Sequence, residues 1–456
     1  MRSLTSLLLL VILSLLLVVS TAHVNAAPHL RNETKTSGRP AQEPKQDWGY
    51  VVVRPNANMF WWLYYSTQQP SDSVPLVLWL QGGPGGSSTG FGNFEEIGPL
   101  DVNQNPRDTT WVSVANVLFI DNPVGAGYSY VTEDSAYTTN VSQIADDLLT
   151  CITAFFKKLP QFETIPFYIF SESYGGKMTA AFSQKLLQAI EAGKVKSNFK
   201  GFAMGDSWIS PVDSVMTWAP YLRSTSLLDV NGYAAVQSLA EKTKAAFDQG
   251  RYTESTTLWG ETEDAIEVNT DNVNFYNILQ HNVPDEKMMK TASVFERLRH
   301  RHLDVYSNDA LSELMNGPLK KKLGIPSSVT WGGQSGEVFE KQREDFMKPV
   351  IDIVDNLITN SSLHVIVYNG QLDLIVDTPG TEIWVQKLTW PGLAHFNKTS
   401  WNPEYTTAHP TDTAFFVKSY DNFAFFWILK AGHMVPADAG DAALLMLEMV
   451  IGSGKN

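Results

Sequence analysis

Short apolar runs, separated by polar or glycine-containing segments, dominate the first half of the chain. The runs WGYVVVRP (48–55) and MFWWLYYS (59–66) alternate or mix apolar and polar positions, which indicates a β-hairpin. The runs PLVLWLQ (75–81) and ANVLFID (115–121) are continuously apolar, as expected of strands buried on both faces. The first half therefore begins as a sheet whose inner strands are enclosed by other elements.

Helical periodicity then alternates with further strand patterns. We predict helices over about 141–158 and 175–192, with the strand PFYIFS (166–171) between them and KGFAMGD (200–206) after them. Such alternation is typical of a parallel sheet wrapped by helices. The pattern predicts the α/β class with a mostly parallel central sheet flanked by helices.

The alternation stops after Asp206. From about 207 to 340 the chain is polar and mostly helical, and strand patterns resume at LHVIVYN (363–369) and FAFFWILKA (423–431). We therefore predict a helical cap insertion over 207–340. The core that forms the sheet would comprise residues 48–206 and 341–456.

The N-terminus has the pattern of a secretory signal peptide over residues 1–26. An apolar block from Leu7 to Leu13 resumes at Leu15 and ends in small residues, with cleavage expected after Ala26. A membrane anchor is the less favoured alternative, because the block is shorter than the roughly 20 residues that a span requires. Residues 27–47 are polar and proline-rich and are expected to form a flexible arm.

The net negative charge of the chain limits the kinds of partner that it can bind. The chain has 456 residues and a net charge of −14, which argues against nucleic acid and, after removal of the signal peptide, against anionic membranes. We expect no cofactor and no metal. The lone Cys151 lies in a helical apolar pattern and is expected to be a buried structural thiol rather than a catalytic one. In a secretory chain, Asn-x-Ser/Thr sequons imply glycosylated surface positions, here Asn32, Asn140, Asn360 and Asn397.

The stretch FYIFSESYGGK (167–177) carries the strongest chemical signal. It predicts a strand, then Ser173 on a sharp turn, then a helix whose amino end favours developing negative charge. The usual pattern for such a turn is Gly-x-Ser-x-Gly, and Ser171 stands here for the first glycine. Gly175 and Gly176 keep side chains out of the turn. Ser173 is therefore a candidate nucleophile.

A nucleophilic serine needs a base and an acid that orients the base. In this architecture they follow the serine in the order acid, then histidine. His433 lies just beyond a late strand in the glycine-containing loop of FWILKAGHMVP. The segment VIVYNGQLDLIVD offers Asp373 and Asp377, and Asp373 is nearer the end of its strand.

The chain resembles the serine carboxypeptidase family of α/β-hydrolases from about Trp48 to near Ile451. The resemblance rests on these segments: WLQGGPGGSSTGFGNFEEIGPL, FIDNPVGAGYSY, FYIFSESYGGK, GDSWISP, YNGQLDLIVD and ILKAGHMVP. It implies an α/β-hydrolase fold with Ser173 as nucleophile, His433 as base and Asp373 as acid. It further implies an oxyanion hole from the backbone N–H groups of Gly83 and Tyr174. A clamp for the substrate carboxylate would comprise Glu172, Glu96, Gln81 and Trp79.

The same resemblance implies an activity. We expect a secreted or lysosomal serine carboxypeptidase that removes C-terminal residues from peptides or proteins through an acyl-enzyme, with an acid pH optimum. The alternatives are a binding or regulatory protein that keeps the triad but has little peptidase activity, and an acyltransferase of the same family. The oligomeric state stays open, with a homodimer as one alternative.

The chemistry of the SES sequence agrees with an exopeptidase. Two neighbouring carboxyl groups in a dry cleft resist double ionisation, and in the protonated form they donate hydrogen bonds to a substrate carboxylate. Two positions depart from the family pattern, which usually has Asn at position 81 and often has a disulfide-forming Cys at position 86. Gln81 is one methylene longer and is expected to displace the clamp by about 1 Å. Gly86 removes that disulfide.

The arginine-rich stretch ERLRHRHLD lies within the predicted insertion. Arg297, Arg299 and Arg301 either mark a protease-sensitive loop or belong to a solvated helix face, and the second alternative is favoured.

Overall fold

The computed structural model describes residues 43–283, 291–303 and 308–452. The expected signal peptide (1–26), the sequon at Asn32 and most of the expected arm (27–47) lie outside these residues. The first strand begins at Gln46, within the segment expected to be an arm. None of the helices formed by the described residues has the length and apolarity needed to cross a membrane.

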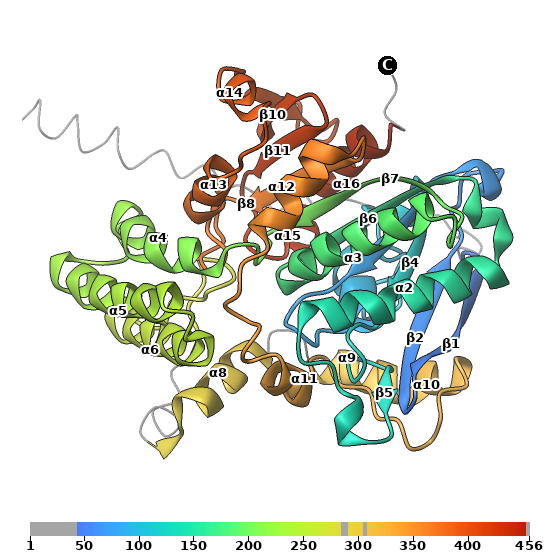
Figure 1. Ribbon diagram of the computed structural model, residues 1–456, viewed down its shortest axis with the longest axis horizontal. Coiled ribbons are helices and arrows are strands. Elements are labelled where there is room, and N and C mark those ends of the chain that lie inside the picture. Colours follow the sequence, from blue (N-terminus) through green and yellow to red (C-terminus); the bar gives the residue numbers. More distant parts are fainter. Residues whose placement is uncertain (1–42, 284–290, 304–307, 453–456) are drawn as a thin grey trace, which may run out of the picture. The chain divides into compact units, whose positions relative to one another are not determined.

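One mixed sheet of eleven strands organises the described residues. Its strands are β1 (Gln46–Arg54), β2 (Ala57–Tyr64), β3 (Leu76–Leu80), β4 (Asn116–Ile120), β5 (Tyr130–Val131), β6 (Pro166–Glu172), β7 (Asn198–Gly205), β8 (His364–Gly370), β9 (Asn402–Tyr405), β10 (Thr413–Tyr420) and β11 (Phe423–Ile428). Their order across the sheet is β1-β2-β4-β3-β6-β7-β8-β11-β10-β9, with β5 paired to β2 (Figure 1).

The middle of this sheet is parallel and both ends are antiparallel. The strands from β4 through β3, β6, β7 and β8 to β11 pair in parallel. The hairpin of β1 and β2 and the meander of β9, β10 and β11 close the two ends. The predicted α/β class with a mostly parallel central sheet is confirmed. Every residue of β3 and β4 is buried, as their continuous apolar sequences predict.

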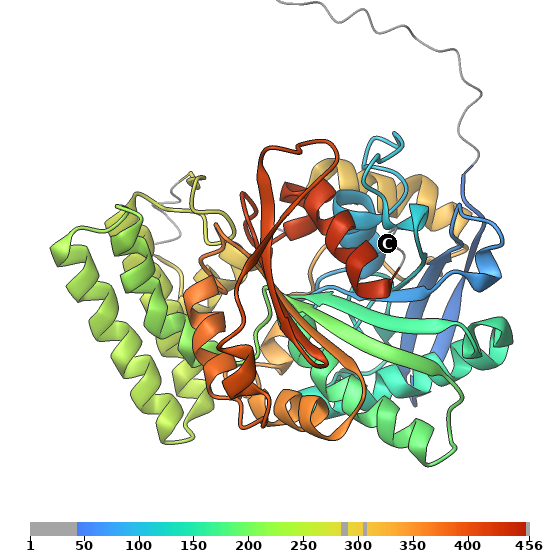
Figure 2. The same cartoon turned by 90° about the horizontal axis from the view of Figure 1, so that it is seen from above.

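Helices lie on both faces of the sheet and beside it. They are α2 (Val141–Lys158), α3 (Tyr174–Glu191), α4 (Pro211–Ser224), α5 (Val230–Asp248), α6 (Tyr252–Thr270), α8 (Val294–Leu303), α9 (Asp309–Leu314), α10 (Lys320–Lys322), α11 (Gly336–Lys341), α12 (Ile351–Asn360), α13 (Thr378–Gln386), α14 (Leu393–Phe396), α15 (Val435–Asp438) and α16 (Gly440–Ile451). Wider helical segments are η2 (Ser88–Ile97) and η7 (Met315–Leu319), and single 3-10 turns are η1 (Ser71–Ser73), η3 (Trp111–Ser113), η4 (Asp134–Ala136) and η5 (Pro160–Glu163). The helices α2 and α3 pack on one face, and α16 packs on the other (Figure 2).

The sequence explains α2 in detail. Asn140 caps its amino end by accepting a hydrogen bond from the backbone N–H of Gln143 at 3.0 Å. Its apolar residues at helical spacing are buried, namely Ile144, Leu148, Ile152 and Phe155. Cys151 lies among them, fully buried, and burial raises the pKa of its thiol. The expected buried thiol is therefore confirmed.

The described residues between β7 and β8 are mostly helical. They include α4 to α12 and contribute no strand to the sheet, and α4, α5 and α6 pack together beside it (Figure 1). That residues 207–340 act as a cap stays a prediction.

Arg297 and Arg301 differ from the two environments proposed for this stretch in separate ways. They belong to α8 rather than to a loop. The side chain of Arg301 is only 5% exposed and pairs with Glu263, Asp264 and Glu267 at 2.6–2.9 Å. Arg297 likewise pairs with Asp264 at 2.6 Å. A solvated helix face is therefore wrong for Arg301, because this side chain of α8 meets the acids of α6 in the interior.

Parallel pairing brings several strand ends to one edge. Ser173 follows β6, Asp206 follows β7, Asp373 follows β8 by three residues, and His433 follows β11 by five. Because the carboxyl ends of neighbouring parallel strands meet at the same edge of an open α/β sheet, these side chains are collected there.

Candidate active site

Ser173 occupies the sharp turn between β6 and α3. Its φ of 62° lies in the left-handed region, where a residue with a side chain is strained. Glycines allow the chain to come this close: a Cβ on Gly82 would lie 2.4 Å from the Ser173 Cβ, and one on Gly175 would lie 2.4 Å from the Leu80 carbonyl oxygen. The turn thus holds the hydroxyl at the amino end of α3.

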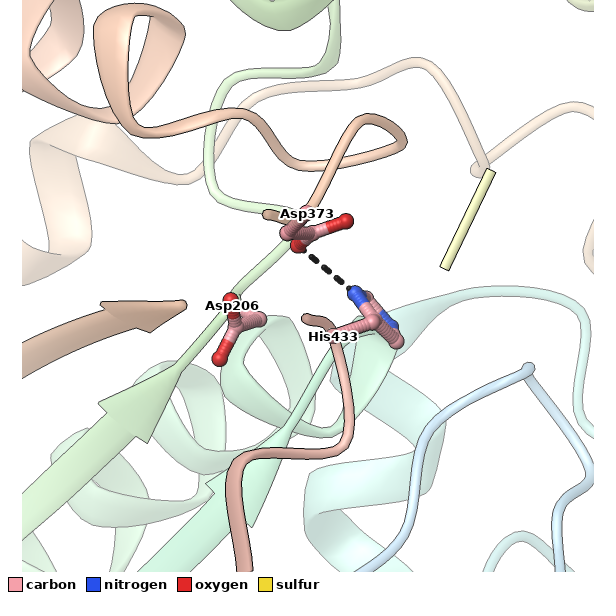
Figure 3. Close-up of side chains that lie close together, drawn as sticks. All are labelled: Asp206, Asp373 and His433. Carbon is pink, nitrogen blue, oxygen red and sulfur yellow. Dashed lines mark hydrogen bonds and ion pairs between the residues drawn. The ribbon is translucent and has the colours of Figure 1, made fainter. Parts of the chain in front are cut away.

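His433 and Asp373 form a buried, hydrogen-bonded pair. The Nδ1 atom of His433 lies 2.8 Å from Asp373 Oδ2, and both side chains are fully buried (Figure 3). The backbone N–H of His433 donates to the Tyr276 carbonyl oxygen at 2.8 Å, and the Tyr276 ring contacts the imidazole nearly edge-on. Asp377, the other acid that the sequence offers, instead accepts a hydrogen bond from Thr217 Oγ1 at 2.8 Å.

The second ring nitrogen of His433 is available for chemistry. Within the part of the chain that the structure describes, Nε2 is buried and has no hydrogen-bond partner. Since Asp373 engages Nδ1, the tautomer with a proton on Nδ1 leaves Nε2 as an acceptor. The pair can therefore take a proton from a hydroxyl brought to Nε2.

Two backbone N–H groups beside Ser173 are candidates for an oxyanion hole. Gly83 follows the glycine that touches Ser173, and Tyr174 is the first residue of α3. Neither N–H donates in the described loop and turn hydrogen bonds. The Gly83 loop is fixed from outside, because Ser87 N donates to the Gly333 carbonyl oxygen at 2.9 Å and Ser335 N donates to that of Gly85 at 3.0 Å.

Glu172 and Glu96 are fully buried carboxyl groups that influence each other's ionisation. Burial raises the pKa of Glu96 to about 7. Burial first, and then the neighbouring charge of Glu96, raise the pKa of Glu172 well above its ordinary value. Both Glu96 oxygens and Glu172 Oε2 have no hydrogen-bond partner among the described residues. At acid pH the pair therefore retains protons and can donate them in hydrogen bonds.

Gln81 connects this pair to Trp79. Its Nε2 donates to Glu172 Oε1 at 2.8 Å, and its Oε1 accepts from Trp79 Nε1 at 2.8 Å. Two glycines provide the room: a Cβ on Gly86 would lie 3.0 Å from Gln81 Cγ, and one on Gly92 would lie 2.8 Å from Gln81 Oε1. Gln81 thus keeps both contacts at ordinary hydrogen-bond lengths with Gly86 beside its Cγ, and the displacement of the clamp by the extra methylene stays a prediction.

Sequence reasoning missed Asp206. It is fully buried directly after β7, the strand between those that lead to Ser173 and Asp373. One ligand-type atom each of Asp206, Asp373 and His433 lie within 4.8 Å of one another. Among the described residues this group alone has the composition for a metal ion, but the hydrogen bond between His433 and Asp373 suits proton transfer better. The available signal was position, an acid immediately after a strand of the parallel core.

The remaining predicted positions are the glycosylation sequons. Asn360 and Asn397 are exposed, and Asn140 is half-buried at the start of α2. Asn397 exchanges two amide hydrogen bonds with Gln386, at 2.7 and 2.9 Å.

The fold and the arrangement at the sheet edge define the class of α/β-hydrolases. The profile of the serine carboxypeptidase family matches residues 37–453. The chain therefore belongs to the serine carboxypeptidase family and is a serine-type carboxypeptidase.

Individual relatives agree with this assignment. The chain is similar to the retinoid-inducible serine carboxypeptidases of Rattus norvegicus (57% identical over 416 residues) and Homo sapiens (54% over 418), with 90% of this chain and 92% of each relative covered. It is 41% identical over 434 residues to serine carboxypeptidase-like 51 of Arabidopsis thaliana, covering 91% of this chain and 94% of that one. Among solved structures, the prohormone-processing carboxypeptidase Kex1 of Saccharomyces cerevisiae superposes with a TM-score of 0.75 at 19% identity, covering 91% and 93% of the two chains.

Proposed function

We propose that this protein removes C-terminal residues from peptides through an acyl-enzyme formed on Ser173. The observation that carries the proposal is the 2.8 Å hydrogen bond between buried His433 and Asp373, with the other ring nitrogen of His433 unoccupied among the described residues. His433 accepts the Ser173 proton as the hydroxyl attacks the scissile carbonyl, and it returns that proton to the leaving amine. Asp373 orients the imidazole and stabilises its charged form.

The N–H groups of Gly83 and Tyr174 stabilise the developing oxyanion in this mechanism. Removing one preorganised donor of this kind raises the barrier by about 3–4 kcal/mol. The amino end of α3 adds a favourable partial positive charge. The strained turn at Ser173 supports this role, because it fixes the nucleophile next to the Gly82–Gly83 segment.

Recognition of a free C-terminus is assigned to Glu172 and Glu96, with Gln81 and Trp79 as supports. A protonated carboxyl group donates a hydrogen bond to the substrate carboxylate, whereas an ionised one repels it. Their raised pKa values support an enzyme that is most active on peptide acids below about pH 7. An acid optimum of this kind suits the lysosome or an acidified secretory compartment, which we propose as the location.

Active-site labelling tests the triad. A fluorophosphonate probe should modify the wild-type enzyme at Ser173, and Ser173→Ala and His433→Ala should each abolish modification while the thermal unfolding temperature is retained. Asp377→Asn is the matched control, because Asp377 is an equally buried acid of the same loop that does not contact His433. Modification that persists in Ser173→Ala would remove Ser173 as the nucleophile.

A further inference from the structure

Asp206 is a third buried acid at the edge where Asp373 and His433 meet. Its Oδ1 accepts a hydrogen bond from the backbone N–H of Gly370 at 2.7 Å, and its Oδ2 has no donor among the described residues. A carboxyl oxygen of Asp206 lies within 4.8 Å of a carboxyl oxygen of Asp373. Figure 3 shows Asp206 just beyond the end of its strand, beside the hydrogen-bonded pair of Asp373 and His433.

Two facing carboxylates cannot hydrogen-bond unless one of them carries a proton. Asp373 already accepts from His433 Nδ1 at 2.8 Å and from Val376 N at 3.3 Å, whereas the one donor to Asp206 among the described residues is the Gly370 N–H. Because Asp373 has more hydrogen-bond donors to stabilise a negative charge, the charge belongs on Asp373 and the proton on Asp206.

We propose that Asp206 is a positioning residue that stays protonated and donates a hydrogen bond to Asp373, which keeps Asp373 ionised and directed at His433 Nδ1. This inference rests on the proposed triad. It gives Asp206 a role through Asp373 rather than a direct contact with substrate.

The electrostatic surroundings agree with this assignment. Burial first, and then the charge of Asp373, raise the pKa of Asp206 well above its ordinary value. Another acid, Asp438 of α15, raises the pKa of Asp206 further. The charge of Asp206 would in turn raise the pKa of Glu172, at the end of β6. His433 is the one base in the group, and it is bonded to Asp373. The neutral form of Asp206 is therefore favoured over a second negative charge.

The hydrogen bond has a functional consequence at acid pH. A donor to Asp373 lowers the proton affinity of the Asp373–His433 pair, because it stabilises the carboxylate and withdraws negative charge from the imidazole. His433 then stays available as a base at lower pH. Asp206 would thus extend the activity of the enzyme into the acid range in which the Glu172–Glu96 pair is protonated.

Two substitutions separate the proposal from its alternatives. Asp206→Asn keeps Oδ1 for the Gly370 N–H and places an amide donor where the proton sits, so it should leave the acid limb of the pH profile where it is. Asp206→Ala removes the donor and should move the acid limb upward by on the order of one pH unit, since hydrogen bonds to charged groups have that strength. If Asp206 were ionised instead, both substitutions would remove a negative charge near His433 and move the limb downward.

The assay is the pH dependence of the rate constant for fluorophosphonate modification. The probe has no carboxylate, so titration of Glu172 and Glu96 in substrate binding does not enter. Asp377→Ala serves as the control and should leave the limb unmoved. A downward shift in Asp206→Asn, or an Asp206→Ala variant that lowers only the thermal unfolding temperature, would overturn the proposal. If Asp206→Ala does not fold, Asp206→Asn alone still decides between the neutral and ionised forms.

Failure of the triad itself has a different signature. Probe modification that survives in Ser173→Ala would reject the proposed nucleophile whatever the Asp206 variants do. A wild-type enzyme modified only at Ser173, together with unshifted limbs in both Asp206 variants, would retain the triad and reject Asp206.

Discussion

Replacing Gln81 with Asn tests how the chain tolerates a clamp residue that departs from the family pattern. Gln81 holds Trp79 Nε1 on one side and Glu172 on the other, each at 2.8 Å. Asn is shorter by one carbon–carbon bond, about 1.5 Å. Its amide cannot keep both contacts, so Trp79 Nε1 or Glu172 Oε1 would lose its partner in a buried site.

The size of the effect follows from that loss. Leaving a buried polar group unsatisfied costs about 1–3 kcal/mol. If the clamp stabilises the transition state less by this free energy, kcat/KM on peptide acids should drop roughly 5- to 150-fold. Ester substrates without a free carboxylate should lose much less, because they do not use the clamp.

A double-mutant cycle with Gly86 shows whether the two departures compensate each other. Gly86→Ala places a Cβ 3.0 Å from Gln81 Cγ and from the Gly82 carbonyl oxygen, so it should slow the enzyme that carries Gln81. The same substitution should be less harmful when it is combined with Gln81→Asn, because the side chain is then shorter, and the coupling energy should be about 0.5–3 kcal/mol. Gly332→Ala is the control, since its Cβ would meet only the Gln334 carbonyl oxygen, at 3.9 Å. A higher kcat/KM in Gln81→Asn, or additive effects, would refute this reasoning.

The buried charges give three more expectations that can be measured. Glu172→Gln keeps a hydrogen-bond donor that does not titrate, so the fall of kcat/KM for peptide acids above about pH 7 should flatten relative to wild type. The folded-state pKa of Glu96 is about 7 against an ordinary 4.5, so its contribution to stability is present below pH 4.5 and is lost as the pH rises through 7. The free energy of unfolding, measured by thermal unfolding with circular dichroism, should therefore fall by up to roughly a few kcal/mol between these pH values. Glu96→Gln should reduce this fall. Arg301→Ala removes the guanidinium that pairs with three acids of α6 and leaves His302 Nε2, at 3.0 Å, as the partner of the fully buried Glu263, so it should destabilise the fold by about 3–5 kcal/mol in denaturant titrations. Arg251→Ala, which breaks an exposed pair, should cost less than about 1 kcal/mol, and equal losses in the two variants would contradict the assignment.

The features predicted correctly from the sequence are those with a local signal. The bounds of α2 follow from its cap at Asn140 and its helical apolar spacing, and β3 and β4 follow from continuous apolar runs. The candidate triad could be selected because each member lies just beyond a strand in the order that this architecture requires. Parallel strand pairing brings the ends of these strands to one edge, and the contact between His433 and Asp373 agrees with that choice, while the place of Ser173 in the triad stays a prediction.

The features missed depend on contacts between distant segments. Strands β9 and β10 were overlooked because their sequences are short or partly polar, and β9 is an edge strand of four residues. The sequence around Arg301 is typical of a surface helix, and its burial depends on ion pairs with acids of α6 that are distant in the sequence. The fit of Gln81 depends on Gly86 and Gly92, and no spacing rule connects a side-chain length at one position to a missing Cβ at another.

The most direct test of the central claim is a C-terminal ladder experiment read by mass spectrometry. One peptide is incubated with the enzyme as the free acid and as the C-terminal amide, from about pH 4 to 7, with Ser173→Ala as the control. The account predicts stepwise loss of single C-terminal residues from the free acid, with the amide at least about 10-fold slower for each hydrogen bond it lacks, and no products with Ser173→Ala. Equal rates for acid and amide across this range would contradict carboxylate recognition by Glu172 and Glu96.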